Sequence, residues 1–252
     1  MFFSTVHPRR SAAALLCAAL LGACAPVAVT PPALAPPATG ADAREAWYRD
    51  AEAGGAPILR LDPQRSLITV IVHRGGALAR LGHDHAVASR TVEGFVAPEQ
   101  GRADFHFRLD QMTVDEAGLR QEAGFDTQPS EAAIAGTRTN MLTRVLDAER
   151  FPLVLVHAER AAAEGPLSVT ITLHGVARTL QIPVRIDTLQ GRMSVSGAVS
   201  LKQSDFGIVP FSVMAGALAV EDRMDLRFTL VATPRPGDAA TGASGPNGPV
   251  AK

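Results

Sequence analysis

The sequence predicts an all-β domain folded as an antiparallel β-barrel. In several segments apolar and polar residues alternate one by one, as in Ala103–Leu109, where Phe105, Phe107 and Leu109 share one face. Short turn sequences such as Leu189–Arg192 separate neighbouring segments. Strands that are apolar on one face only are typical of antiparallel sheets, because the other face of such a sheet meets water.

The alternating pattern predicts about eight strands. A second short turn, Glu164–Pro166, joins two of them and favours a meander of consecutive neighbours. An open sheet of such strands would leave unpaired edges, which closure into a barrel removes. We therefore expect a barrel, with a sandwich as the alternative. The predicted strands are Ser66–His73, Ala86–Val96, Ala103–Leu109, Leu153–Glu159, Leu167–His174, Leu180–Asp187, Met193–Leu201 and Met224–Leu230.

One helix is expected between these strands, from Ser130 to Asp147. Apolar side chains such as Ile134, Met141 and Leu142 recur there at the three- and four-residue spacing of a helix face. Phe151-Pro152 is expected to stop the helix, because proline cannot continue the backbone hydrogen bonding.

The first 24 residues have the layout of a secretory signal. Arg9 and Arg10 precede an apolar run, Ala12–Ala23, which is too short for a spanning helix of roughly 20 residues. The run ends in Leu-Gly-Ala-Cys24, which resembles the lipobox of bacterial lipoproteins. We expect residues 1–23 to be removed and Cys24 to be acylated. The alternatives are a soluble secreted protein or an uncleaved anchor.

Composition divides the rest of the chain into three parts. Residues 24–56 begin with a Pro/Ala-rich stretch that predicts an extended tether with a brief helical turn at Asp42–Asp50, and residues 234–252 predict a disordered tail. The barrel domain is expected at 57–233. Cys17 would leave with the signal, so the mature chain would have no disulfide. A net charge of -1 gives nucleic-acid binding no electrostatic support, and only the lipid anchor predicts membrane contact.

Four segments, in order along the chain, resemble the YceI-like family: Leu61–Ile68, Asn140–Pro152, Leu173–Leu180 and Ser204–Ile208. The resemblance implies an extended lipocalin-like antiparallel barrel of about eight strands with one helix packed across it. It also implies a secreted or periplasmic protein that binds long, polyisoprenoid-like amphiphiles inside the barrel. The arginine that usually precedes the last of these motifs is replaced by Gln203.

A second departure lies in Leu81–His85, whose Gly-His-Asp-His sequence resembles only one branch of that family. On an extended backbone His83 and His85 would point the same way, as half of a metal site does. A second such pair is missing, although single histidines occur at His73, His106, His157 and His174. The alternatives are a tight turn in which Asp84 accepts backbone hydrogen bonds, and a contact with a ligand headgroup.

The sequence contains no nucleophile elbow, phosphate loop or dinucleotide fingerprint, so no cofactor and no catalytic residue is predicted. An acidic segment follows the third predicted strand. We expect a solvated loop there, because nothing around these carboxyl groups is apolar enough to perturb their pKa values. Its acids are Asp115, Glu116, Glu122, Asp126 and Glu131.

The inward face of the strands is the candidate ligand-binding surface. A filled core would show the same periodicity, although the small Gly197 favours space inside. With the resemblance, the sequence predicts an envelope lipoprotein, sorted to the outer membrane if the host is Gram-negative, that holds a hydrophobic, isoprenoid-like molecule for carriage, sequestration or sensing, without chemistry. The rivals are a metal-dependent enzyme using His83 and His85, and a solid-core structural or docking domain. The inward residues are Phe105, Phe107, Leu109, Val169, Ile171, Leu173, Val195, Val199 and Phe228.

Overall fold

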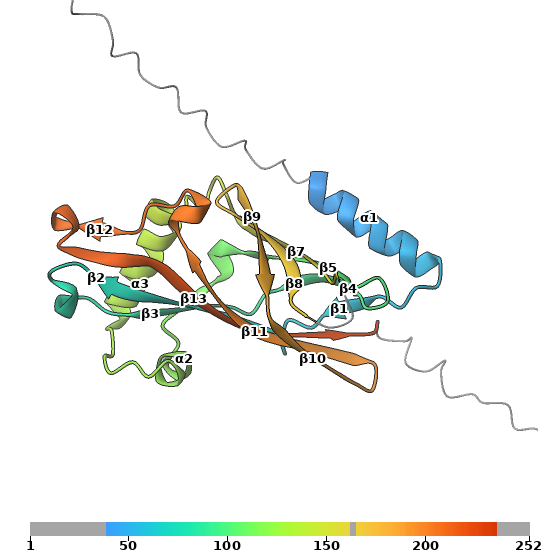
Figure 1. The fold of residues 1–252 in the computed structure, drawn as a ribbon. Coiled ribbons are helices and arrows are strands. Elements are labelled where there is room, and N and C mark those ends of the chain that lie inside the picture. The colour runs from blue at the N-terminus through green and yellow to red at the C-terminus, as the bar shows by residue number, and fades with distance from the viewer. Residues whose placement is uncertain (1–38, 162–164, 236–252) are drawn as a thin grey trace, which may run out of the picture. The chain divides into compact units, whose positions relative to one another are not determined.

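The computed structural model describes residues 39–161 and 165–235, which form one curled antiparallel sheet with helices around it (Figure 1). All pairs between the described strands are antiparallel, as the one-sided alternation predicts. The strands are β1 (Leu59–Leu61), β2 (Leu67–Gly75), β3 (His85–Ser89), β4 (Glu93–Ala97), β5 (Arg102–Arg108), β6 (Thr113–Val114), β7 (Leu153–Glu159), β8 (Leu167–Leu173), β9 (Val176–Ile182), β10 (Val184–Leu189), β11 (Arg192–Lys202), β12 (Ser212–Val213) and β13 (Leu218–Thr233).

The strands follow the order β6-β3-β2-β13-β1-β4-β5-β7-β8-β9, and β11 joins β10 to β13. Among the described strands, β9 has no ladder to β10 or β11, so the sheet curls without closing and the expected closed barrel is wrong in this respect. Pro183 lies between β9 and β10. Because proline has no N–H and a fixed φ, it cannot extend a ladder at the point where closure is needed.

Two predicted strands are each two strands in the structure. Ala86–Val96 is interrupted at residues 90–92 between β3 and β4, and Leu180–Asp187 is divided at Pro183. The short strands β1, β6 and β12 escaped prediction because two or three residues are too few to show a period. Leu109 is the last residue of the predicted strand Ala103–Leu109, but in the structure it begins a 3-10 turn, Leu109–Gln111.

The helices are α1 (Thr39–Ala53), α2 (Ala117–Glu122) and α3 (Glu131–Asn140), and a π-helical turn, Met141–Val145, continues α3. Ser130 caps α3, since its side chain accepts a hydrogen bond from the Ala133 N–H at 3.2 Å. The predicted helix therefore starts where expected, but its last turn is π-helical rather than α-helical. It ends before Phe151-Pro152, at Asp147 in a left-handed conformation (φ 44°), where the Ala148 N–H bonds the Leu142 carbonyl.

Helix α1 packs on the outside of the sheet beside β4 (Figure 1). Its Tyr48 is 1% exposed, stacks on Phe95, and donates a hydrogen bond to Asp104 Oδ2 at 2.9 Å. The Arg102 guanidinium lies 4.5 Å from the centre of the Trp47 ring. Part of the segment assigned to the tether (24–56) is thus a docked helix, longer than the turn expected at 42–50. Burial and the nearby Asp104 charge raise the pKa of the Tyr48 hydroxyl.

Two tight hairpins follow the turn chemistry of the sequence. The β10–β11 turn has positive φ at Gln190 (51°) and Gly191 (74°), and the β8–β9 turn at His174 (52°) and Gly175 (75°). Positive φ at both central positions is the pattern of type I′ turns, which match the twist of paired strands. The turn predicted at Leu189–Arg192 is therefore confirmed.

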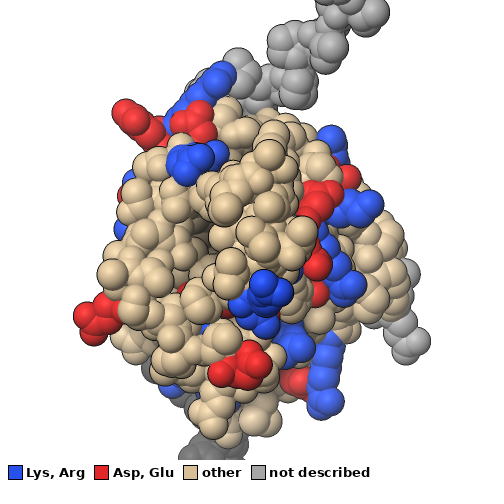
Figure 2. Space-filling model, turned by 90° about the vertical axis from the view of Figure 1, so that its left-hand side faces the viewer, with Lys and Arg blue, Asp and Glu red and all other residues tan. Residues whose placement is uncertain are grey.

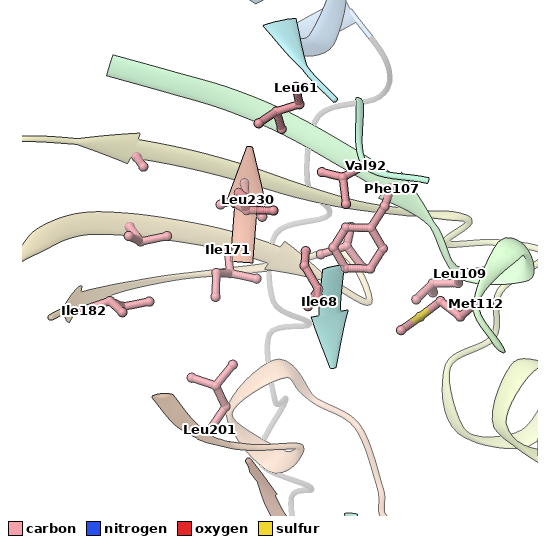
Figure 3. Close-up of a cluster of buried hydrophobic side chains, with 14 of the residues drawn as sticks. Leu61, Ile68, Val92, Phe107, Leu109, Met112, Ile171, Ile182, Leu201 and Leu230 are labelled. Atoms are coloured by element: carbon pink, nitrogen blue, oxygen red, sulfur yellow. The ribbon is translucent and has the colours of Figure 1, made fainter. Parts of the chain in front are cut away.

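The apolar core lies inside the curl of the sheet. Figure 3 shows side chains from β2, β5, β8 and β13 directed toward one another there, among them Ile68, Phe107, Ile171 and Leu230. No helix of the described residues is long and apolar enough to cross a membrane. The predicted signal peptide (1–23), Cys24 and most of the tail (236–252) lie outside the described residues, as does Glu164 of the second predicted turn.

Candidate functional site

An apolar cavity of about 340 Å³ lies inside the curled sheet. This volume falls within the range of small-molecule sites, roughly 300–1,000 Å³. On β13 every second residue from Met224 to Ala232 lines it, a span of roughly 26 Å at ~3.3 Å per residue. The cavity therefore follows the long axis of the strands, a form suited to a chain-like ligand.

The cavity wall contains every residue of the predicted inward face. Alternation along a strand sets side-chain direction without regard to distant partners, which is why the sequence found these positions. Their contact with a ligand stays a prediction. They are Phe105, Phe107, Leu109, Val169, Ile171, Leu173, Val195, Val199 and Phe228.

The cavity shows that the interior is hollow, contrary to the solid-core alternative. Gly197 contributes differently from the expectation. A Cβ at this position would lie 2.7 Å from Phe228 Cζ and 2.9 Å from the Pro183 carbonyl oxygen. Gly197 pairs with Phe228 across the β11–β13 ladder, so its missing side chain makes room for the Phe228 ring rather than for a ligand.

Few polar residues line the cavity, and they lie toward its two ends. One end lies beside α3, and Thr137 and Asn140 of α3 line it together with His85 and Gln203. At the other end, Arg102 at the start of β5 and Arg160 after β7 line the cavity, although the Arg102 guanidinium lies against Trp47 of α1 on the outside of the sheet. Figure 2 views the molecule from the α3 side, and that face is hollowed near its centre, with most charged residues toward the margins.

His85 begins β3 and reaches the cavity on the same strand face as Val87. Its Nδ1 lies 2.7 Å from Asp115 Oδ2, and the imidazole retains 13% of its exposure. Asp115, directly after β6, also accepts the Ala86 N–H at 3.1 Å. Its side chain is fully buried. One ring nitrogen of His85 is thus held by a carboxylate, while the ring borders the cavity.

Arg120 of α2 is the third side chain of this network. It is 1% exposed and donates to Asp115 Oδ1 at 2.7 Å, to the Asp84 carbonyl at 2.6 Å, and to the carbonyl and hydroxyl of Thr127. Burial acts to raise the pKa of Asp115, but the hydrogen bonds from His85, the Ala86 N–H and Arg120 outweigh it and hold that pKa below its usual value.

The predicted solvated acidic loop is therefore wrong at Asp115, although Glu122, Asp126 and Glu131 are exposed as expected. Glu116 is intermediate in exposure and pairs with Arg90 at 2.8 Å. Sequence reasoning missed Asp115 and Arg120 because the network that buries them includes His85, which lies 30 residues before Asp115. The apolar pair Met112 and Val114, two residues apart, was the one signal that a strand precedes this acid.

The two histidines of the Gly-His-Asp-His segment play different roles. Their ring centres lie 6.4 Å apart with planes at 71°, and the buried Nδ1 atom of His83 has no hydrogen-bond partner among the described residues. Asp84 accepts the Arg74 N–H at 2.9 Å, as the tight-turn alternative expects. Within the described ranges no group of three or more metal-ligating side chains converges.

The comparisons with known proteins fit this architecture. The profile of the YceI-like domain matches residues 59–232. The chain belongs to the YceI-like family. The match ends within one residue of the last β13 position, so it includes the whole cavity wall. In this member of the YceI-like family, the buried Gln203 replaces the arginine expected before Ser-Asp-Phe-Gly and donates to the Glu221 carbonyl at 2.8 Å.

A solved structure shows the same fold at low sequence identity. A polyisoprenoid binding domain from Saccharophagus degradans, implicated in plant cell wall breakdown, is 14% identical, with a TM-score of 0.51 over 70% of this chain and 98% of that one. BcnA of Burkholderia cenocepacia is 16% identical, with a TM-score of 0.49 over 69% of this chain and 99% of that one. No curated protein matches the sequence significantly.

Proposed function

We propose that this YceI-like protein binds a long hydrophobic or amphiphilic molecule of the isoprenoid type in its cavity. The observation that carries the proposal is the cavity of about 340 Å³, lined along the strands by apolar side chains. Burial of an apolar chain stabilises a complex by ~25 cal/mol per Å², and apolar walls offer few groups for chemistry. The relative from Saccharophagus degradans, named for polyisoprenoid binding, supports this ligand class.

We extend the proposal to an envelope lipoprotein that carries, sequesters or senses its ligand without catalysing a reaction. The support for this part is the signal layout that ends in Leu-Gly-Ala-Cys24. Acylation at Cys24 would hold the domain near a membrane, where such a ligand dissolves. The alternative is a metal-dependent enzyme that uses His83 and His85, but among the described residues no group of three or more metal-ligating side chains converges there.

The first test is native mass spectrometry of the protein extracted from its own host without detergent exchange. We expect a retained mass that corresponds to a long-chain lipid. The second test is retention of radiolabelled geranylgeraniol by delipidated protein through gel filtration. Comparable retention by a cavity-blocked variant and the wild type would contradict binding inside the sheet.

Ile171→Trp supplies the blocked variant, because Ile171 lies on the wall and its side chain is directed to the interior (Figure 3). The larger ring would occupy space that the ligand needs. Thr172→Trp is the matched control, since the next residue along β8 points to the opposite face of the sheet. We expect Ile171→Trp to lower affinity at least tenfold and Thr172→Trp to leave it unchanged. Melting temperatures establish that both variants fold.

A further inference from the structure

The α3 end of the cavity carries a polar network whose hydrogen-bond directions are defined. We propose that this end selects ligands that terminate in a hydroxyl group, and that the hydroxyl donates a hydrogen bond to Nε2 of His85. The inference rests on the proposed function and deepens it, because it names an isoprenoid alcohol, rather than an ether or a hydrocarbon, as the preferred ligand.

The donor and acceptor roles follow from Asp115. An ionised carboxylate only accepts hydrogen bonds, so the 2.7 Å contact requires Nδ1 of His85 to carry the proton. In a neutral imidazole with the proton on Nδ1, Nε2 is an acceptor. The permanently charged Arg120 offsets the negative charge of Asp115, so the carboxylate does not need a second positive charge from His85.

The network is rigid enough to keep this arrangement. Arg120 donates five hydrogen bonds from a buried position, to Asp115, Asp84 and Thr127. The Ala86 N–H and Arg120 both donate to Oδ1 of Asp115, and His85 contacts Oδ2. An imidazole held by such partners cannot exchange its tautomer without breaking a buried hydrogen bond.

Within the described part of the chain, Nδ1 is the one ring nitrogen of His85 with a hydrogen-bond partner, which leaves Nε2 to the ligand. Its own strand places Val87 beside it on the wall, and Val72 of the paired strand β2 lines the same end. Helix α3 adds Asn140 to the wall, and its amide N–H is a hydrogen-bond donor for an oxygen of the ligand. An ether oxygen has no hydrogen to donate, so it would form no hydrogen bond with the lone pair of Nε2.

The test compares binding of geranylgeraniol and its methyl ether by delipidated protein. The wild type should bind the alcohol about three- to tenfold more tightly, the worth of one net hydrogen bond. His85→Leu should bind both probes equally, with the ether affinity of the wild type. Asp115→Asn should present an amide N–H to Nδ1, move the imidazole proton to Nε2, and so raise affinity for the ether toward that for the alcohol.

The imidazole nitrogen chemical shifts of the wild type report the tautomer directly and need no variant. Protonated Nδ1 and unprotonated Nε2 would support the inference, and the reverse assignment would overturn it. Equal affinity of the wild type for alcohol and ether, or a preference that survives in His85→Leu, would also overturn it while leaving the proposed function in place. Failure of both probes to bind would instead count against the proposed function itself.

Discussion

Replacement of Arg120 by methionine tests whether the buried network governs stability. Methionine keeps an apolar stem of similar length to pack beneath Phe125, whose ring centre lies 5.0 Å from the guanidinium. It removes the positive charge and all five hydrogen bonds. The Asp115 carboxylate would then be buried with only His85 and the Ala86 N–H as partners.

The expected cost follows from that unpaired charge. Removal of one partner from a buried ion pair costs about 3–5 kcal/mol, because the other charge stays desolvated. For a domain of this size such a loss lowers the melting temperature by roughly 10 °C. Arg120→Lys keeps the charge but loses the planar fork that reaches Asp84 and Thr127 together, so its cost should be smaller.

Urea unfolding followed by circular dichroism measures these free energies. The double variant Arg120→Met/Asp115→Asn should recover part of the loss, since it removes the carboxylate charge that Arg120→Met leaves buried without a partner charge. A cost below ~1 kcal/mol for Arg120→Met, with an unchanged dependence on urea concentration, would refute the reasoning. So would a double variant no more stable than Arg120→Met alone.

Four further predictions follow from separate parts of the chain. Asp115→Asn should make the free energy of unfolding less dependent on pH in the acid range. The pKa of Asp115 is lower in the folded state than its unfolded value of ~3.9. The stability that Asp115 contributes is therefore complete at pH values well above ~3.9 and is lost as the pH falls through the folded pKa. Urea unfolding from neutral pH into the acid range measures the difference from wild type, and parallel profiles would contradict the assignment. Tyr48→Phe should cost about 1.5–3 kcal/mol in urea unfolding, because it deletes a hydrogen bond to the charged Asp104, and an unchanged stability would mean that α1 is held by packing alone. Gly197→Ala should cost about 1–3 kcal/mol in thermal unfolding, since its Cβ would collide with Phe228 and the Pro183 carbonyl, and a neutral result would show that the ring moves freely. Cys24→Ser should release the protein from envelope membranes in fractionation with its melting temperature unchanged, and a variant that still sediments with membranes would disprove lipid anchoring.

The candidate site divides into a part that the sequence predicts and a part that it does not. The direction of a side chain on a strand depends only on its position in the alternation, so Phe105, Val169 and Val195 could be assigned to the interior without knowledge of their neighbours. Asp115 could not be assigned, because a carboxylate in a Gly-containing segment has the composition of a solvated loop. Its burial depends on Arg120 and His85, which only the fold brings to it.

The sequence by itself determined the antiparallel strands, the start of α3 at Ser130, the tight turn at Leu189–Arg192 and the inward face, because each follows from contacts within a few residues. The tertiary structure alone decided that the sheet stays open beside Pro183, that the interior is hollow, and that α1 docks on the sheet. Those outcomes depend on how side chains distant in sequence fill a shared volume, and periodicity along one strand carries no information about volume.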